Sequence, residues 1–559
     1  MKEGCKKYIP FKPVELESRT WPCNKIERAP TWCSVDLRDG NQALIDPMNL
    51  PEKLEMFKTL CAIGIKEIEV GFPSASETEY EILRALIDGG YIPDDVKIQV
   101  LVQSREHLIR KTFEAIKGAK NVIFHFYNST SALQRKVVFR TDKRGVTDIA
   151  VNAAKLIKQL GDEAKADGTN IIYEYSPESF MGTETDFAAD ICATVMDALG
   201  ADENNKVILN LPSTVESSTP NLFADQIEYF CRCLPHREHA IISLHPHNDR
   251  GTGVADTELA LLAGADRVEG TLFGNGERTG NVDIITLAMN MYSHGVDPKL
   301  DFSDMPYLVD EYEKCTRMHV YERAPYAGAL VFAAFSGSHQ DAIAKGMKYR
   351  AKNKLHQWNV PYIPIDPKDI GRTYDADVIR VNSQSGKGGI GYLLEQTYGY
   401  NLPPKMREHF SYLCKDISDH EHKELKPDEV LNIFEENYLN LTNGVTVTDF
   451  EFMRDKDNVK IGITFAKDGE ETEMEAEGNG SLNAINNALR AYTGAEYTLQ
   501  VFTQHSMQGQ GSQSVAASYI GLEKEDGSMF WGAGTDTDVV KANTKALLSA
   551  YNNMIKGGN

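Results

Sequence analysis

Two histidines separated by one residue are the clearest chemical signal in the sequence. His245 closes an apolar run at 240–245 and His247 follows it, and residues i and i+2 of an extended segment point to the same side. Two neutral imidazoles suit a divalent metal ion. Taken alone, this spacing more often marks a hydrogen-bonded histidine pair, so the metal hypothesis depends on what else lies nearby.

Two further residues could complete a metal site. Asp39 follows the apolar run at 32–37, and Asn281 follows the run at 267–273. If the runs close into a barrel, the first strand lies beside the last, and both side chains can join the two histidines. Two imidazoles with oxygen ligands can hold Mg²⁺, Mn²⁺ or Zn²⁺, and this mixed set does not choose among them.

The elements that must position these residues form a repeated pattern. Eight apolar or β-branched runs lie at 32–37, 65–71, 96–102, 121–127, 170–176, 206–211, 240–245 and 267–273, with helix-patterned stretches between them. Alternating strands and helices predict a parallel sheet, and eight units over about 250 residues are typical of a TIM barrel. An open doubly wound sheet is the alternative, but the Gly-rich fingerprint after its first strand is missing.

The active site of a TIM barrel lies at the carboxyl ends of its strands. Polar side chains occur there on nearly every predicted strand, which folding stability alone explains poorly. Besides the candidate metal ligands they are Arg38, His125, Glu174, Ser176, Glu178, Asn210, Thr214 and Glu277.

Several of these side chains allow two interpretations. Arg38 is either a structural ion-pair partner of Asp39 or a fixed cation for an oxyanion that forms beside the metal. Glu178 is either a surface carboxylate or a group that binds a substrate hydroxyl or relays a proton. Asn210 and Thr214 are common turn residues that could also hydrogen-bond a substrate carboxylate.

The rest of the chain is predicted to form two further parts. Helical patterns interrupted by Pro/Gly-rich stretches predict a linker subdomain at 304–436. Strand-like runs precede helices at 481–492 and about 537–555, and a weak internal repeat predicts a C-terminal α+β domain at 437–559. The predicted fold class is therefore α/β, with a (β/α)8 TIM barrel and its N-terminal extension at 1–303.

Composition limits the partners and the compartment. The 559 residues include 59 Lys and Arg against 81 Asp and Glu, a net charge of −22, which disfavours general binding to nucleic acid or membranes. Nine cysteines without a CxxC pair fit reduced thiols. The first residues lack the apolar segment of a signal peptide, and no run of about 18 apolar residues occurs. We therefore expect a cytoplasmic location.

Six motifs, in their order along the chain, resemble the 2-isopropylmalate synthases. They are DLRDGNQAL, HFYNSTS, YEYSPESFMGTE, LPSTVE, HPHNDRGT and LFGNGERTGNV. The likeness continues through YAGALVFAAFSGSHQDAI and VPYIPIDPKDIGRTYDADVIRVNSQSGKGG, and more loosely into the C-terminal domain. Asp-Gly-Asn-Gln after the first arginine of the set resembles the long form of the family, which belongs with homocitrate and citramalate synthases to a metal-dependent barrel superfamily.

The resemblance implies a Claisen-type condensation. Acetyl-CoA and a small 2-oxo acid, 3-methyl-2-oxobutanoate, would give 2-isopropylmalate and CoA after thioester hydrolysis, the committed step toward leucine. Asp39, His245, His247 and Asn281 would hold the divalent metal, Mg²⁺ in the first place and Mn²⁺ or Zn²⁺ as alternatives. Arg38 would steady the carbonyl oxygen as it becomes an alkoxide. The positions that match the oxo-acid pocket are His125, Ser176, Glu178, Asn210 and Thr214.

The resemblance also implies a homodimer regulated by leucine. His339 and Tyr362 match positions that the family's linker subdomain delivers into the barrel of the partner chain. His339 is then the preferred base for the acetyl-CoA methyl group, because a neutral imidazole suits that task near pH 7, while Glu178 and Glu277 stay open. The C-terminal domain is similar to the family's leucine-sensing domain.

Two other functions use the same features differently. A lyase that cleaves a 3-hydroxyacyl-CoA would share the barrel and both histidines, but such lyases usually end near the barrel. A non-catalytic amino-acid sensor would use only the C-terminal domain, and the cluster of candidate metal ligands argues against it.

Overall fold

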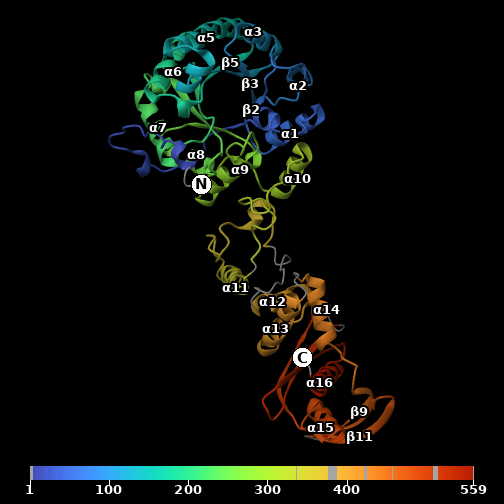
Figure 1. Cartoon of the computed structure of the whole chain (residues 1–559). Helices are drawn as coiled ribbons and strands as arrows, with labels where there is room; N and C mark the ends of the chain where they lie inside the picture. The colour runs from blue at the N-terminus through green and yellow to red at the C-terminus, as the bar shows by residue number, and fades with distance from the viewer. Residues whose placement is uncertain are drawn as a thin grey trace. The chain divides into compact units, whose positions relative to one another are not determined.

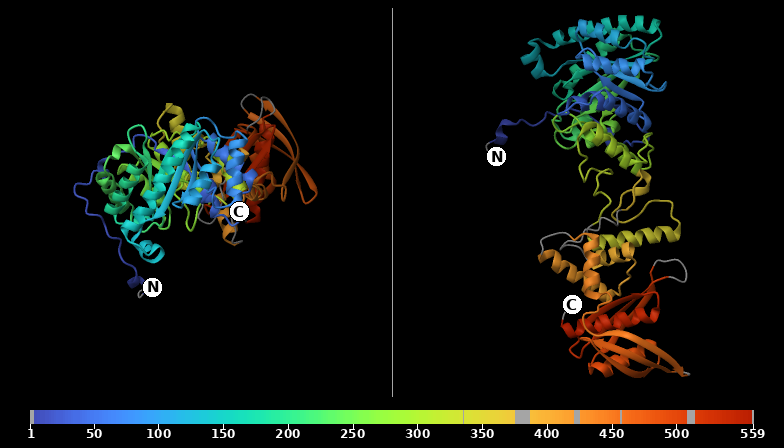
Figure 2. Two further views of the ribbon diagram at one scale, coloured as in Figure 1. Left: turned by 90° about the horizontal axis from the view of Figure 1, so that it is seen from above. Right: turned by 90° about the vertical axis from the view of Figure 1, so that its right-hand side faces the viewer.

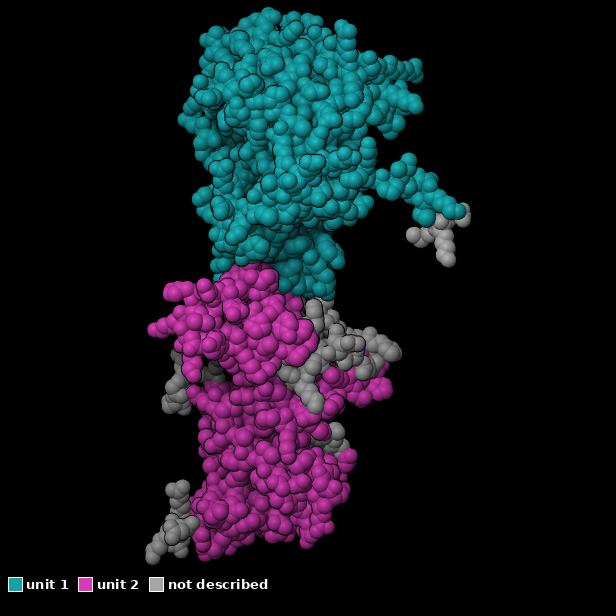
Figure 3. Space-filling view, turned by 90° about the vertical axis from the view of Figure 1, so that its left-hand side faces the viewer, with its two compact units in different colours: residues 1–331, 367–372 teal, residues 332–366, 373–559 magenta. Residues whose placement is uncertain are grey.

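The computed structural model describes residues 4–334, 336–374, 387–420, 425–455, 458–507 and 514–557 (Figure 1). The chain separates into two compact units. The first is Met1–Val331 with Pro367–Arg372, and the second is Phe332–Asp366 with Thr373–Asn559 (Figure 3). Residues 375–386, which carry part of the last sequence motif, lie outside the described residues. The predicted three-part division at 303 and 436 stays a prediction.

The first unit is a closed barrel of eight parallel strands in sequence order (Figure 1). The strands are β1 (Thr31–Ser34), β2 (Glu67–Gly71), β3 (Lys97–Gln103), β4 (Asn121–Ser129), β5 (Asn170–Glu178), β6 (Val207–Ser213), β7 (Ala240–Pro246) and β8 (Arg267–Gly270). Thr31 lies opposite Arg267 and Ser34 opposite Gly270, so β1 pairs with β8 and closes the sheet. The predicted TIM barrel is confirmed, and the open-sheet alternative is wrong.

Helices follow the strands and surround the barrel (Figures 1 and 2). They are α1 (Leu50–Ala62), α2 (Glu77–Asp88), α3 (Glu106–Ala115), α4 (Ala132–Gln134), α5 (Lys143–Ala166), α6 (Thr185–Leu199), α7 (Pro220–Cys233), α8 (Gly253–Leu262), α9 (Ile284–Ser293) and α10 (Met305–Thr316). In α2 the Ser76 side chain caps the first turn, and Ile82, Leu83 and Leu86 form the buried face. None of the helices among the described residues combines the length and the apolarity that crossing a membrane requires.

The first strand is shorter than the sequence predicts. β1 ends at Ser34, and Asp36–Gly40 forms one turn of π-helix in place of further strand. The buried Asp36 carboxylate holds this turn, because it accepts hydrogen bonds from the Ser34 hydroxyl at 2.8 Å and from the Leu272 N–H at 3.1 Å. The turn lies between β1 and the loop after β8, and it carries Arg38 and Asp39.

The second unit combines helices with two antiparallel sheets. The helices are α11 (Gly337–Asn353), α12 (Lys387–Tyr398), α13 (Pro404–His420), α14 (Pro427–Tyr438), α15 (Ser481–Thr493) and α16 (Val539–Lys556). One sheet has the order β11 (Glu470–Gly478), β10 (Asn458–Lys467), β9 (Thr446–Asp455), and the other has the order β12 (Thr498–Ser506), β13 (Ala516–Glu523), β14 (Met529–Asp536). Each sheet is followed along the chain by one helix, α15 after β11 and α16 after β14, which agrees with the predicted internal repeat.

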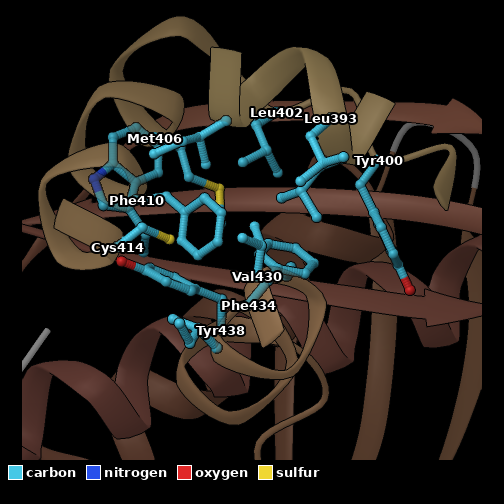
Figure 4. Packing of buried hydrophobic residues seen from close by; sticks show 14 of the residues in the cluster. Leu393, Tyr400, Leu402, Met406, Phe410, Cys414, Val430, Phe434 and Tyr438 are labelled. Carbon is cyan, nitrogen blue, oxygen red and sulfur yellow. The ribbon is translucent and has the colours of Figure 1, made fainter. Parts of the chain in front are cut away.

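Helices α12, α13 and α14 share one apolar core with the sheet of β13 and β14 (Figure 4). Phe410 and Phe434 meet edge to face with ring centroids 5.6 Å apart. Tyr438 and Trp531 are buried in the same cluster. The helical segment before residue 438 is therefore built into the packing of the C-terminal sheet.

Candidate active site

One cavity at the carboxyl ends of the barrel strands collects most of the predicted site residues. Its volume is about 220 Å³. The predicted residues that line it are Arg38, Asp39, His125, Ser176, Glu178, Asn210, Thr214, His245, His247 and Glu277. Asn281 is not among the lining residues, but an isolated bridge pairs it with His247.

The four predicted metal ligands lie together. Asp39 Oδ2 is 3.7 Å from His245 Nε2 and 3.8 Å from His247 Nε2, and all three side chains are buried. Asn281 presents Oδ1 to His245 Nε2 at 2.9 Å and donates from Nδ2 to Asp39 Oδ2 at 2.8 Å. The carboxylate–imidazole separations exceed a hydrogen bond but suit atoms that share one ion. Two imidazoles, a carboxylate and an amide oxygen are donors that fit a divalent ion.

Arg38 is fixed beside this group of ligands. Its Nη1 donates to Asp39 Oδ1 at 2.5 Å, and its Nε donates to Glu69 Oε1 on β2. Two carboxylates therefore hold the guanidinium while it lines the cavity. The ion pair of the first interpretation is therefore present, and the role of Arg38 toward an oxyanion stays a prediction.

A chain of hydrogen bonds crosses the cavity floor. Glu69 Oε2 lies 2.9 Å from His125 Nδ1, and His125 Nε2 lies 2.7 Å from the Ser176 hydroxyl. Asn210 Nδ2 donates to the same hydroxyl at 3.0 Å. Glu69 thus holds both Arg38 and His125, a role that sequence reasoning missed. The signal was a charged residue inside the apolar run at 65–71.

Three family models match successive parts of the chain. The family model described as HMGL-like matches residues 29–310. A model of the alpha-isopropylmalate synthase post-catalytic domain matches 329–395, and a model of the LeuA allosteric (dimerisation) domain matches 424–555.

Curated relatives match along nearly the whole chain. A 2-isopropylmalate synthase of Helicobacter hepaticus is 56% identical over 538 residues, covering 95% of this chain and 96% of its own. Those of Desulfitobacterium hafniense and Acetoanaerobium sticklandii are 55% and 52% identical and cover 94% and 97% of their own lengths, and 95% and 98% of this chain. The chain belongs to the 2-isopropylmalate synthases. The resemblance seen in the sequence motifs is confirmed, and the agreement beyond the barrel favours a synthase over the lyase alternative.

Burial and neighbouring charges shift the pKa values of the candidate metal ligands in different directions. Burial disfavours a charged His245, but hydrogen bonds and charges of Asp39 and Glu269 raise the pKa of His245 to about 10. Burial, followed by the charge of His245, lowers the pKa of His247 to about 4. Burial also opposes the charge of Asp39, yet Arg38 and His245 hold the pKa of Asp39 well below its usual value. Since metal ligands must be unprotonated, an ion would compete with the proton on His245.

Apolar residues of the cavity wall were not identified from the sequence. They are Phe72, Leu101, Tyr127 and Pro212. All four belong to or follow strands in which nearly every residue is buried, so the sequence pattern does not separate the residues that face the cavity from those that face the helices. Their presence adds apolar surface to a lining that is otherwise mostly polar or charged.

The remaining predicted residues are placed as follows. Glu178 accepts a hydrogen bond from Ser129, and Glu277 accepts one from Gln42 Nε2 at 3.2 Å. His339 and Tyr362 belong to the second compact unit, where their rings stack with centroids 3.9 Å apart. The structure therefore brings these two residues to each other, and the cavity lining described above does not include them.

Proposed function

We propose that the barrel cavity is the catalytic site of a 2-isopropylmalate synthase. Acetyl-CoA and 3-methyl-2-oxobutanoate react with water there to give 2-isopropylmalate and CoA, the committed step of leucine biosynthesis. The observation that carries this proposal is the grouping of Asp39, His245 and His247 beside the fixed cation of Arg38. A divalent ion held by these three residues and Asn281, in the first place Mg²⁺, would supply a Lewis acid for the oxygens of the oxo acid.

The chain's own residues bind and orient the substrates. Arg38 offers a cation that two carboxylates fix in advance, and such a donor stabilises an alkoxide oxygen as it forms. His125, Ser176, Asn210 and Thr214 offer polar groups to the oxo acid. The isopropyl group would contact apolar lining residues such as Leu101 and Pro212.

We assign His339 as the base that removes a proton from the acetyl-CoA methyl group. Its ring is exposed and stacked on the exposed Tyr362, so the tyrosine orients the imidazole. Glu178 and Glu277 line the barrel cavity and are the alternative bases. Substitution of His339, Glu178 and Glu277 by glutamine, one at a time, separates the three assignments. Only loss of the true base abolishes exchange of the acetyl-CoA methyl protons with solvent deuterium.

Exposed apolar side chains follow several barrel strands at the end where the cavity lies, and we take them as an argument that a second chain covers this end. In the loops after β1, β4 and β6, exposed apolar residues are Ile45, Leu133, Val137, Val138 and Val215, with Ile45 95% exposed. A match to a LeuA dimerisation domain points to a homodimer. We propose a domain-swapped dimer in which the linker subdomain of one chain brings His339 and Tyr362 to the barrel of the other.

Mixing two inactive variants tests the swap. Asp39→Ala disables the barrel and His339→Ala disables the subdomain, so a swapped heterodimer regains one intact site of two. Equal mixing after subunit exchange should restore about a quarter of the wild-type rate, since half of the dimers are mixed. Recovery that stays at the level of the separate variants would contradict the swap.

Leucine is the proposed effector, because the domain model matched at 424–555 is allosteric. The full chain must be used, since removal of the C-terminal domain would expose the core shared with α12–α14. Leucine should lower the rate while valine, one methylene shorter, has less effect. The proposal also includes a cytoplasmic location and no nucleic-acid or membrane partner.

Product analysis tests the function itself. Mass spectrometry should find 2-isopropylmalate when acetyl-CoA, 3-methyl-2-oxobutanoate and Mg²⁺ are all present. Removal of the metal should stop product formation, and Mg²⁺, Mn²⁺ and Zn²⁺ added back separately identify the ion. Cleavage of a separately added 3-hydroxyacyl-CoA, with no 2-isopropylmalate formed from the synthase substrates, would support the lyase alternative.

A further inference from the structure

A buried carboxyl group on β5, Glu174, takes no part in the site described so far. Its side chain is fully buried two residues before Ser176. Among the described residues, no donor group makes a hydrogen bond to either of its oxygens. Its Oε1 lies 3.6 Å from His125 Nε2, and its Oε2 lies 3.6 Å from Arg267 Nη2. An unpartnered carboxyl group at the floor of an active site needs an explanation.

Other carboxylates already use the cations of the barrel interior. Arg267 donates from Nε to Glu67 at 2.6 Å and from Nη1 to Glu269 at 2.5 Å. Its Nη2 donates to Gln99 Oε1 at 2.6 Å. Arg38 is taken by Glu69 and Asp39, as described above. An ionised Glu174 would therefore be a buried anion without a hydrogen bond, which is costly, whereas a protonated Glu174 is neutral.

The surroundings of Glu174 join the two halves of the site. Oxygens of Glu174 and Glu269 and a ring nitrogen of His125 lie within 4.8 Å of one another. Glu269 Oε2 accepts from His245 Nδ1 at 2.8 Å, so it orients a predicted metal ligand. His125 contacts Ser176, which lines the cavity. Glu174 lies close to both of these partners and to Arg267.

We propose that Glu174 is a positioning residue of the synthase. As a neutral carboxylic acid it fixes Glu269, which contacts the predicted metal ligand His245, relative to His125, which contacts Ser176 in the oxo-acid pocket. The protonated oxygen faces His125 and Glu269. The other oxygen faces Arg267 Nη2 as an acceptor. Residues behind ligands and substrate contacts commonly change activity or metal affinity about 10- to 100-fold when they are replaced.

The charges around Glu174 agree with a neutral side chain. Burial raises the pKa of Glu174 well above its usual value, and the negative charge of Glu269 raises it further. Arg267 acts in the opposite direction, and Glu69 on β2 adds to the rise. His125 faces the group from β4, while Arg267 and Glu269 face it from β8.

Glutamine and leucine at this position separate the proposal from a purely structural role. Glu174→Gln keeps a neutral group with a donor toward His125 and Glu269 and an acceptor toward Arg267. We expect its kcat and both KM values to stay within about threefold of wild type. Glu174→Leu keeps the volume but loses both polar groups. We expect its KM for the oxo acid to rise at least about tenfold while its KM for acetyl-CoA changes less than about twofold.

The matched control is Glu269→Gln, the same chemical change on the neighbouring carboxylate that accepts from His245. It should lose activity and metal affinity, which shows that glutamine is tolerated only where the carboxyl group is neutral. Thermal unfolding and circular dichroism of each variant check that it is folded. In addition, the infrared band of a protonated carboxyl group should appear in the wild-type minus Glu174→Gln difference spectrum near neutral pH.

Two results would overturn the proposal. A folded Glu174→Gln variant as impaired as Glu174→Leu, without the protonated band, would mean that the site needs a charged Glu174. A Glu174→Leu variant with wild-type kcat and KM values would mean that Glu174 positions nothing. If the leucine variant does not fold, the glutamine variant and its infrared spectrum still decide, because the proposal requires that variant to be active.

Discussion

Replacement of Asp256 by asparagine should remove a large pH dependence from the stability of the barrel. Asp256 lies on α8 with its side chain fully buried, and neither oxygen has a hydrogen-bond partner among the described residues. Burial raises the pKa of Asp256 to about 8, and the charge of Glu216 adds to the rise. The folded protein therefore keeps this carboxyl group protonated at neutral pH.

The sign of the effect follows from the proton count. Between the ordinary carboxyl pKa of 3.8 and about 8, the folded protein binds a proton that the unfolded chain has released. The contribution of Asp256 to the free energy of unfolding is thus greatest below about pH 4, falls with rising pH and levels off above about pH 8. At about 1.36 kcal/mol per pH unit, wild type loses about 2 kcal/mol between about pH 6 and about pH 8 through this group alone.

Urea unfolding at the two pH values measures this difference. Asp256→Asn should lose about 2 kcal/mol less than wild type between about pH 6 and about pH 8, because its amide does not ionise. Asp148→Asn, at an exposed position on α5, is the control and should behave as wild type. Catalytic activity should be retained, because Asp256 does not line the cavity. An equal pH dependence in wild type and Asp256→Asn would refute the argument that the buried carboxyl group is neutral.

Three further predictions concern the site. Asp39→Ala should abolish turnover and the calorimetric signal of Mn²⁺ binding, and a variant that keeps the full rate would contradict the ligand assignment. Arg38→Lys should lower kcat about 10²- to 10³-fold with the protein still folded, because one ammonium group cannot reproduce the fixed guanidinium held by Asp39 and Glu69; a loss below about threefold would show that the fixed cation is not needed. Leu101→Ala should improve kcat/KM for longer 2-oxo acids relative to 3-methyl-2-oxobutanoate by about tenfold or more, whereas an unchanged ratio would move the isopropyl group to another wall.

The barrel could be predicted because its strands are short apolar runs at regular spacing. In the second unit, the sequence patterns did not predict strands β9 and β14 or helix α12, and each omission has a physical reason. β14 contains Gly532 and Gly534, which read as a loop, but α16 packs so closely that a side chain at either position would strike its backbone. β9 carries acidic and apolar residues without a clear period. Helix α12 begins inside a Gly-rich segment that reads as a loop.

The site could be predicted only where neighbouring strands fix the geometry. The two histidines share one side of an extended segment, and barrel closure brings Asp39 and Asn281 to them. Glu69 and Glu269 were not recognised as site partners, and Glu174 was named at a strand end without a role, because a strand that is buried on both faces does not reveal which residues point inward. The stack of His339 on Tyr362 joins the start of helix α11 to a residue 23 positions later, beyond the end of that helix, and only the family resemblance had singled them out.

Release of CoA from acetyl-CoA is the most direct test of the central claim. The assay compares 2-oxo acids of graded size with Mg²⁺ present and after its removal, and a blank without oxo acid corrects for exposed thiols such as Cys5, Cys23 and Cys233. We expect the highest kcat/KM with 3-methyl-2-oxobutanoate and no release without a metal ion. A preference for pyruvate or 2-oxoglutarate, or an undiminished rate in the metal-free protein, would contradict the assignment of this cavity to 2-isopropylmalate synthesis.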